Sequence, residues 1–133
     1  MTPQTGPIAV FAEAGGFVLD QFRPALANGF EIVGETYEVE IIVKDSQSSS
    51  NRAASVASEL ILNDEVDLIL ATSTPETTNP VADQAELNEV ACITNNTPWL
   101  PHFFSRQGRS RQGYWTFHFF WGVDDVISTY TGI

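Results

Sequence analysis

Apolar and polar positions follow two different periods along the chain, one typical of helices and one typical of strands. Apolar residues recur every three or four positions over residues 9–27 and Ser50–Asn63, and again through Val81 towards Glu89, which predicts three helices. Short runs rich in β-branched and aromatic residues predict strands at Tyr37–Lys44, Val66–Leu70, Ala91–Thr94 and Tyr114–Trp121. Strands that are separated by helices pair in parallel, so we expect the α/β class, a three-layer αβα sandwich with a mostly parallel sheet.

Local signals set several of the expected boundaries. Asn28 and Gly29 supply a stop for the first helix, although Pro24 strains its last turn. Ser49 is in the position of an N-cap for the second helix. A long loop is expected from Asn95 to Arg111, and the acidic pair Asp124-Asp125 predicts the start of a last helix.

Length and charge narrow the class of protein. With 133 residues and 43% hydrophobic composition, the chain can form one domain with one core. Six basic and seventeen acidic residues give a net charge of −11, which repels phosphate backbones and predicts no nucleic-acid partner. No apolar run reaches the ~20 residues of a membrane span, and Met1-Thr2-Pro3-Gln4 does not begin like a secretory signal.

Hydroxyl-bearing residues follow the second buried strand. In an α/β sheet, ligands bind beyond the carboxyl ends of the strands, and Thr72–Thr78 stands at such an end and at a helix N-terminus. Free backbone N–H groups and the helix dipole at this place favour a carboxylate or a phosphate. The alternative is that Ser73 or Thr74 simply caps the helix. A phosphate-binding loop is disfavoured because the stretch has no Gly and no Lys follows it.

A second polar group follows the next strand, at Asn95–Trp99. Side-chain amides, a hydroxyl and an indole can hold a polar head group and stack on a flat one. The alternative is an ordinary turn, since Asn and Pro are common turn formers.

Residues for catalysis are few. His118 lies in an aromatic strand, where a core histidine is expected, and His102 lies in a loop without a spaced Cys, Asp or Glu. No serine stands in a nucleophile elbow, and Cys92 between apolar neighbours is expected to be a small core residue. The sequence therefore predicts no enzyme, no catalytic residue, no metal and no cofactor.

The order of these motifs resembles the type I solute-binding proteins of ABC transporters, in the branched-chain amino-acid-binding (Leu/Ile/Val-binding) group. The resemblance rests on Thr5-Gly6-Pro7, Lys44–Ala54, Val66–Leu70, Ser73–Ala82 and Cys92-Ile93-Thr94. It covers nearly the whole chain, and the combined order is more specific than any single piece.

The resemblance implies two α/β lobes that close on a small solute. Residues 1–133 are then a single lobe, the N-terminal one, and the second lobe and the first strand of the family are absent from this sequence. Carried over by position, the ligand-binding residues are Phe11, Ser73, Thr74, Thr77, Asn96 and Thr97, and Trp99 is added from its place in the loop. Pro75 and Glu76 depart from the small residues of many family members, and Glu76 opposes a carboxylate unless it meets an ammonium group.

The implied function is that of the substrate-binding component of an ABC transporter, which binds an amino acid or similar small polar solute for import. The alternative is the ligand-sensing domain of a receptor with the same fold. The full-length protein is expected to be periplasmic or extracellular and lipid-anchored, and to deliver its solute to a transporter permease. Because half of a cleft supplies half of the contacts, this chain alone is expected to bind weakly. A lobe without its central strand exposes unpaired edges, so a homodimer or strand-swapped assembly is expected.

Overall fold

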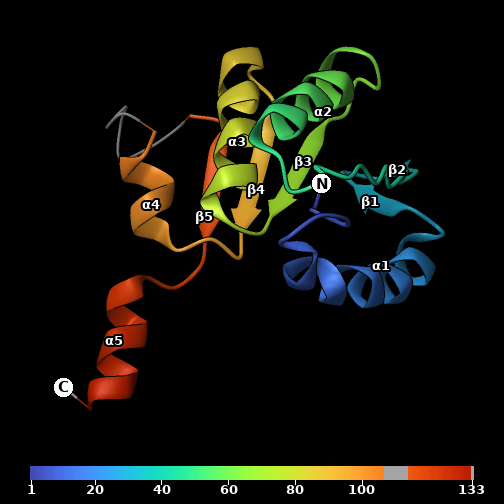
Figure 1. Ribbon diagram of the computed structural model, residues 1–133. Helices are drawn as coiled ribbons and strands as arrows, with labels where there is room; N and C mark the ends of the chain where they lie inside the picture. The colour runs from blue at the N-terminus through green and yellow to red at the C-terminus, as the bar shows by residue number, and fades with distance from the viewer. Residues whose placement is uncertain (107–113, 133) are drawn as a thin grey trace.

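A parallel sheet of three strands forms the centre of the structure, a computed structural model that describes residues 1–106 and 114–132 (Figure 1). The strands are β3 (Leu68–Thr72), β4 (Ala91–Asn95) and β5 (Thr116–Phe119), in the spatial order β3-β4-β5. The register pairs Leu70 with Ile93 and Ile93 with Phe117. The predicted α/β class with a parallel sheet is confirmed.

Two helices, α2 (Ser50–Leu62) and α3 (Pro75–Asn88), cover one face of this sheet (Figure 1). Alternate strand residues point towards them, so Ile69 and Ala71 are buried while Leu68 and Leu70 are exposed. The core beneath the helices consists mainly of small side chains, namely Ala53, Ala57, Ile61, Ile69, Ala71, Val81, Ala85 and Cys92. Small residues allow the helices to lie close to the sheet and to each other.

The N-termini of α2 and α3 follow from local chemistry. The Ser49 hydroxyl accepts a hydrogen bond from the Arg52 N–H at 3.3 Å, which confirms the predicted cap. Helix α3 begins at Pro75, where the missing N–H costs little because the first turn has no partner for it. It therefore starts earlier than the run through Val81 had indicated, and it contains Pro80.

The N-terminal part of the chain is packed less deeply. A short 3-10 helix η1 (Ala9–Ala12) leads into α1 (Glu13–Leu26), which confirms the first predicted helix. An antiparallel hairpin follows, formed by β1 (Phe30–Ile32) and β2 (Glu35–Tyr37), and the sequence did not predict it. None of these four elements contains a buried residue.

The predicted strand over Tyr37–Lys44 is wrong. Tyr37 ends β2, and residues 38–44 form no regular strand. A strand requires a hydrogen-bonded neighbour, and the N-terminal segment at Thr2 pairs only with the end of this stretch. The Thr2 N–H donates to the Lys44 carbonyl at 3.3 Å, and the Ser46 N–H donates to the Thr2 carbonyl at 3.2 Å. On its other side the same segment meets β3, since the Met1 amine donates to the Leu70 carbonyl at 2.5 Å.

Two further predictions need correction. The loop expected from Asn95 contains a helix, α4 (Trp99–Phe104), because Pro98 and Pro101 are compatible with a first helical turn; residues 107–111 of that loop lie outside the described residues. The aromatic strand is limited to Thr116–Phe119, where β4 supplies a partner.

The last helix, α5 (Val123–Thr131), confirms the predicted acidic start. Asp124 and Asp125 lie in its first turn, and the Gly122 N–H donates to the Asp125 carboxylate at 2.6 Å. In Figure 1 this helix stands apart from the sheet, at the end of the segment that leaves β5. It has no buried residue.

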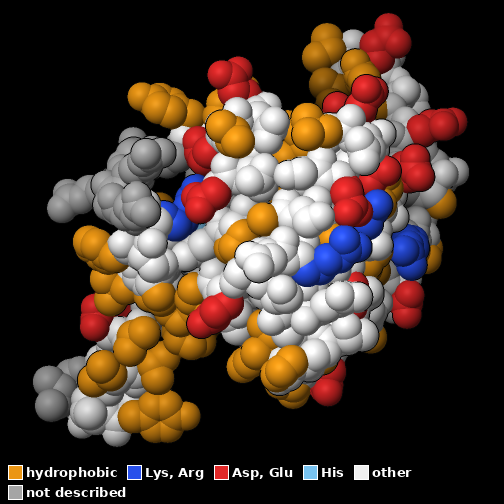
Figure 2. All heavy atoms as spheres, turned by 45° about the horizontal axis from the view of Figure 1, so that its top comes forward, with side chains coloured by type: hydrophobic (Ala, Val, Ile, Leu, Met, Phe, Trp, Pro, Cys, Tyr) orange, Lys and Arg blue, Asp and Glu red, His pale blue; other side chains and the backbone are white. Residues whose placement is uncertain are grey.

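The face of the sheet opposite α2 and α3 remains exposed among the described residues. Leu70, Phe117 and Phe119 are 59%, 60% and 79% exposed. Figure 2 shows acidic side chains spread over the visible surface, basic side chains at few places, and apolar side chains gathered at the end of the molecule that carries α5. None of the described helices combines the length and the hydrophobicity needed to cross a membrane.

Candidate functional site

Three of the predicted ligand-binding residues meet at one backbone atom, the carbonyl oxygen of Phe11. The Ser73 hydroxyl donates to it at 3.3 Å, and the Asn96 amide donates to it at 3.5 Å. These residues come from η1, from the loop after β3 and from the loop after β4. The parallel strands bring the two loops together at the carboxyl edge of the sheet, as the sequence predicted.

The chain between β3 and α3 has an uncommon backbone conformation. Ser73 and Thr74 have φ values of 75° and 48°, in the left-handed region, and neither is glycine. Each such residue costs on the order of 1–3 kcal/mol and persists only where its surroundings hold it. Asn96, across the edge, is also left-handed with φ 56°, which Asn tolerates well.

Buried hydroxyl groups hold this turn in place. The carbonyl of Ser73 accepts hydrogen bonds from the hydroxyls of both Thr77 and Thr78, the latter at 3.1 Å. Thr97 in turn donates to the Thr78 hydroxyl at 3.1 Å. Thr77, Thr78 and Thr97 are 1%, 0% and 0% exposed, so this hydroxyl chain lies beneath the turn.

The predicted residues therefore fall into two layers. Phe11, Thr74 and Asn96 lie at the edge, whereas Ser73 is 0% exposed and its hydroxyl, like those of Thr77 and Thr97, is engaged within the protein. Sequence reasoning did not single out Thr78, although its position directly after Thr77 at a helix start was a usable signal.

Thr74 carries an unused hydrogen-bonding group. Its backbone carbonyl accepts from the N–H groups of Thr77 and Thr78, at 3.3 and 3.0 Å. Its hydroxyl makes no capping bond, is buried, and has no partner within the part of the chain that the structure describes. Simple capping by Thr74 or Ser73 side chains, the alternative raised above, is thus not seen, because the Ser73 hydroxyl bonds to Phe11 instead.

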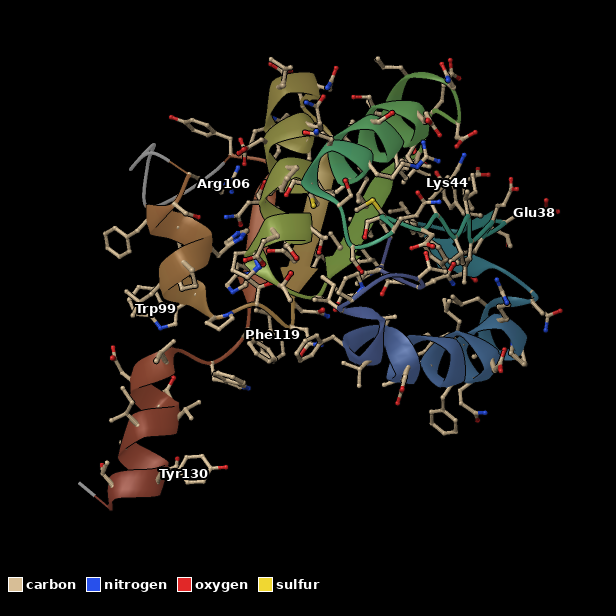
Figure 3. All side chains as sticks on the ribbon, in the orientation of Figure 1. Glu38, Lys44, Trp99, Arg106, Phe119 and Tyr130 are labelled. Carbon is tan, nitrogen blue, oxygen red and sulfur yellow. The ribbon has the colours of Figure 1, made fainter. Side chains whose placement is uncertain are left out.

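Trp99 lies at the start of α4 and is 37% exposed (Figure 3). Its indole packs so closely on Gly122 that a side chain at that position would overlap it. Trp99 does not share the hydrogen bonds that join Phe11, Ser73 and Asn96. The Phe11 ring is 53% exposed and is available to a ligand.

The turn that precedes Phe11 is fixed by a carboxylate. Asp45 accepts hydrogen bonds from the N–H groups of Gln4, Thr5 and Gln47 and from the Thr5 hydroxyl, the last at 2.7 Å. Partial burial raises the pKa of Asp45, but these hydrogen bonds outweigh it and lower the pKa below its ordinary value. The charged carboxylate therefore holds the segment that leads to Phe11.

Groups for covalent chemistry are not in a reactive state. Burial raises the pKa of the Cys92 thiol to about 12, so the thiol stays protonated near neutral pH. Among residues 1–106 and 114–132, no three His, Cys, Asp or Glu side chains are grouped to hold a metal ion. What the edge offers is hydrogen bonding and an exposed aromatic ring.

Residues 1–132 match the family of periplasmic binding proteins, and the chain belongs to this family. The family-level resemblance read from the motifs is thereby confirmed. A comparison with curated protein sequences finds no match.

Solved structures share the fold. The branched-chain amino-acid transporter substrate-binding protein LivJ from Streptococcus pneumoniae, in complex with isoleucine, has a TM-score of 0.74 and 21% identity, and the match covers 98% of this chain and 36% of LivJ. A solute-binding protein of an ABC transporter from Rhodopseudomonas palustris, in complex with 3,4-dihydroxybenzoic acid, has a TM-score of 0.70 and 18% identity, with 90% and 30% covered. A branched-chain amino-acid transporter protein from the same species has a TM-score of 0.68 and 20% identity, with 91% and 31% covered. The chain thus spans about a third of the length of these proteins.

Proposed function

We propose that this chain is the N-terminal lobe of the solute-binding component of an ABC transporter and has no catalytic activity. The observation that carries the proposal is the edge at which Ser73 and Asn96 meet the Phe11 carbonyl, together with the buried Thr74 hydroxyl, which has no partner among the described residues. Membership of the periplasmic binding protein family supports it. The proposal includes a periplasmic or extracellular, lipid-anchored location and a permease partner for the full-length protein.

The ligand that suits this edge is a small carboxylate such as an amino acid. The Thr74 hydroxyl is a donor at the N-terminus of a 14-residue helix, where the dipole favours a negative group. A desolvated hydroxyl without a partner costs roughly 1–3 kcal/mol, which a ligand oxygen would recover. LivJ binds isoleucine and the Rhodopseudomonas protein binds 3,4-dihydroxybenzoic acid, and both ligands carry a carboxylate.

Trp99, Thr77 and Thr97 have different places in this proposal. Trp99 would contact the part of the solute away from the carboxylate, from the side of the cleft at α4. Thr77 and Thr97 would act on the solute through the Ser73-Thr74 turn that their hydroxyls support. Glu76, exposed in the first turn of α3, would face the positive group of an amino acid rather than its carboxylate.

The test is an NMR titration of the ¹⁵N-labelled chain with isoleucine and, separately, with 3,4-dihydroxybenzoate. We expect weak binding, because one lobe supplies only part of the contacts and each ~1.4 kcal/mol lost lowers affinity tenfold. The amide shifts are expected to centre on Ser73, Thr74 and Asn96. The proposal is contradicted if neither solute shifts any amide signal up to its solubility limit, or if the shifted amides do not include Ser73, Thr74 and Asn96.

A pair of Thr→Val variants makes the test specific. Thr74→Val removes the unpartnered hydroxyl and is expected to weaken binding about tenfold, the equivalent of one hydrogen bond. Thr36→Val makes the same change at an exposed position of β2 and is expected to leave binding unchanged. Equal affinities for the two variants would remove Thr74 from the site.

We further propose that the 133-residue chain by itself pairs with a second copy through the exposed sheet face. Leu68, Leu70 and Ile93 on this face join Phe117 and Phe119 in one apolar surface across three strands. Light scattering after size-exclusion chromatography is expected to give a dimer, and Phe119→Glu a monomer. A wild-type chain that remains monomeric at about 100 μM contradicts this pairing.

A further inference from the structure

Two imidazole rings stack on one another between α4 and β5. His102 of α4 and His118 of β5 have ring centroids 4.3 Å apart and planes inclined by 20°. They are the two histidines of the chain. His102 is fully buried and His118 partly buried, and the Phe103 ring meets both edge-on, with centroids at 5.2 and 5.9 Å.

The hydrogen bonds of this pair are compatible with neutral rings. The Nδ1 of His102 lies 2.7 Å from the side-chain amide oxygen of Asn79, which only accepts, so Nδ1 carries a proton. The Asn79 amide nitrogen donates to the Ser105 hydroxyl at 2.7 Å, which fixes the amide orientation. The Thr94 hydroxyl lies near one nitrogen of each ring, 2.8 Å from the Nδ1 of His118 and 3.4 Å from the Nε2 of His102.

Among the described residues, no carboxylate forms a hydrogen bond or an ion pair with either ring. The guanidinium of Arg106, two residues beyond the end of α4, is paired with Asp83 of α3 at 2.7 Å. Glu86 of α3 is engaged with the N–H groups of Tyr114, Trp115 and Thr116. From β4, the neutral hydroxyl of Thr94 lies within hydrogen-bonding distance of both rings.

We propose that the stacked pair His102 and His118 is an acid-sensitive latch, which fastens α4 and the preceding loop to β5 while both rings are neutral and releases them when the rings are protonated. The consequence for solute binding rests on the function proposed above, because it assumes that Asn96, in the loop before α4, and Trp99 of α4 contact the solute. The release of α4 from β5 does not depend on that assumption.

The direction of the pH effect follows from the lowered pKa values of both histidines in the folded chain. Burial, then the charges of His118 and Arg106, lowers the pKa of His102 from 6.5 to about 3, and burial lowers the pKa of His118 although the Thr97 backbone acts in the opposite sense. The unfolded chain takes up these protons near pH 6.5, so stability is complete above that pH and falls as the pH drops towards 3.

The window from pH 6.5 to 4.5 separates the histidines from the carboxylates. Asp45 and Glu86 both have lowered pKa values, and their ordinary values are 3.8 and 4.5. Their contribution to stability is lost only below those values, as the pH falls towards the pKa of the folded state. Any loss of stability between pH 6.5 and 4.5 that depends on His118 therefore reports on the latch.

The decisive variant is His118→Asn, which keeps a group near Nδ1 to meet Thr94 but cannot be protonated. Urea unfolding at several pH values measures the folding equilibrium constant of the wild type and of the variant. Between pH 6.5 and 4.5 we expect the wild-type constant to fall more steeply, by up to a further factor of ten per pH unit. Hydrogen exchange of the α4 amides, corrected for the intrinsic rate, is expected to rise in acid in the wild type before that of α2. Equal slopes, with α4 and α2 exchanging in parallel, overturn the proposal.

An NMR titration of the wild-type histidine ring protons decides the question if the variant does not fold. Both rings are expected to remain neutral in the folded chain well below pH 6.5, while a reference histidine introduced by Gln21→His on exposed α1 titrates normally. Ordinary titration of either native ring in the folded chain overturns the latch. The isoleucine titration at pH 7.5 tests the site separately, because the latch is closed at that pH and an absence of binding there counts against the function alone.

Discussion

Helices α1 and α2 are of similar length and carry apolar residues at similar spacing, yet their surroundings differ. Helix α1 has 14 residues and none is buried, while α2 has 13 residues and five are buried. Phe17 and Phe22 of α1 are 69% and 56% exposed, whereas Val56 and Ala57 of α2 are 0% exposed. An amphipathic pattern thus states which face can be buried, and only a packed neighbour such as α3 buries it.

The N-terminal part, formed by η1, α1, β1 and β2, and the packed part, formed by the three-stranded sheet with α2 and α3, are connected by polar contacts rather than by a shared core. Asp45 and Ser48 bind the turn that precedes η1, and the Phe11 carbonyl binds Ser73 and Asn96. The candidate site lies at this connection.

The largest effect is expected from one substitution made in each part. Ile69→Ala removes a side chain that is 2% exposed in β3, and we expect it to lower the free energy of unfolding by about 2–5 kcal/mol. Ile32→Ala makes the same change at a position of β1 that is 47% exposed, and we expect less than about 1 kcal/mol. Urea unfolding of both variants measures the difference, and similar losses would show that the N-terminal part is packed as firmly as the sheet.

A smaller effect is expected from the hydroxyl chain under the Ser73-Thr74 turn. Thr78→Val preserves the shape of the side chain but leaves the Thr97 hydroxyl without its acceptor, so we expect a loss of about 1–3 kcal/mol. Thr78→Ser retains the hydroxyl and serves as the control, with an expected loss below about 1 kcal/mol. If the valine variant matched the wild type in urea unfolding, the turn would not depend on this hydroxyl.

The smallest effect is expected at the connection itself, in Asp45→Asn. We expect about 1 kcal/mol at pH 7, because the amide keeps one acceptor but loses the charge. The folded carboxylate has a lowered pKa, so its contribution is present above its ordinary value of 3.8 and is lost as the pH falls through the lower folded value. The difference between wild type and variant should therefore shrink below pH 3.8, and a constant difference would exclude the charge as its cause.

Much of the secondary structure could be predicted from the sequence. The helices over Ser50–Leu62 and Glu13–Leu26 and the cores of β3, β4 and β5 were found, because their periods and caps are local signals. The joining of Ser73 and Asn96 at one edge was also predicted, since parallel strands place their carboxyl ends together. The strand predicted over Tyr37–Lys44 was wrong because a strand needs a hydrogen-bonded partner, and α4 was missed because it depends on packing against α3.

The chain's sequence alone determined its α/β class, the order of α2, β3, α3, β4 and β5 and the edge at which the candidate site lies, since these follow from side-chain periods and from the geometry of parallel strands. Only the tertiary structure decided that Thr77 and Thr97 are engaged inside while Thr74 keeps an unpartnered hydroxyl. It also brought together His102 of α4 and His118 of β5, which follow one another along the chain but whose rings stack only in the folded protein. The physical reason is that hydrogen bonds and ring stacking depend on distances of a few ångströms, which the packing of separate elements sets and no local pattern records.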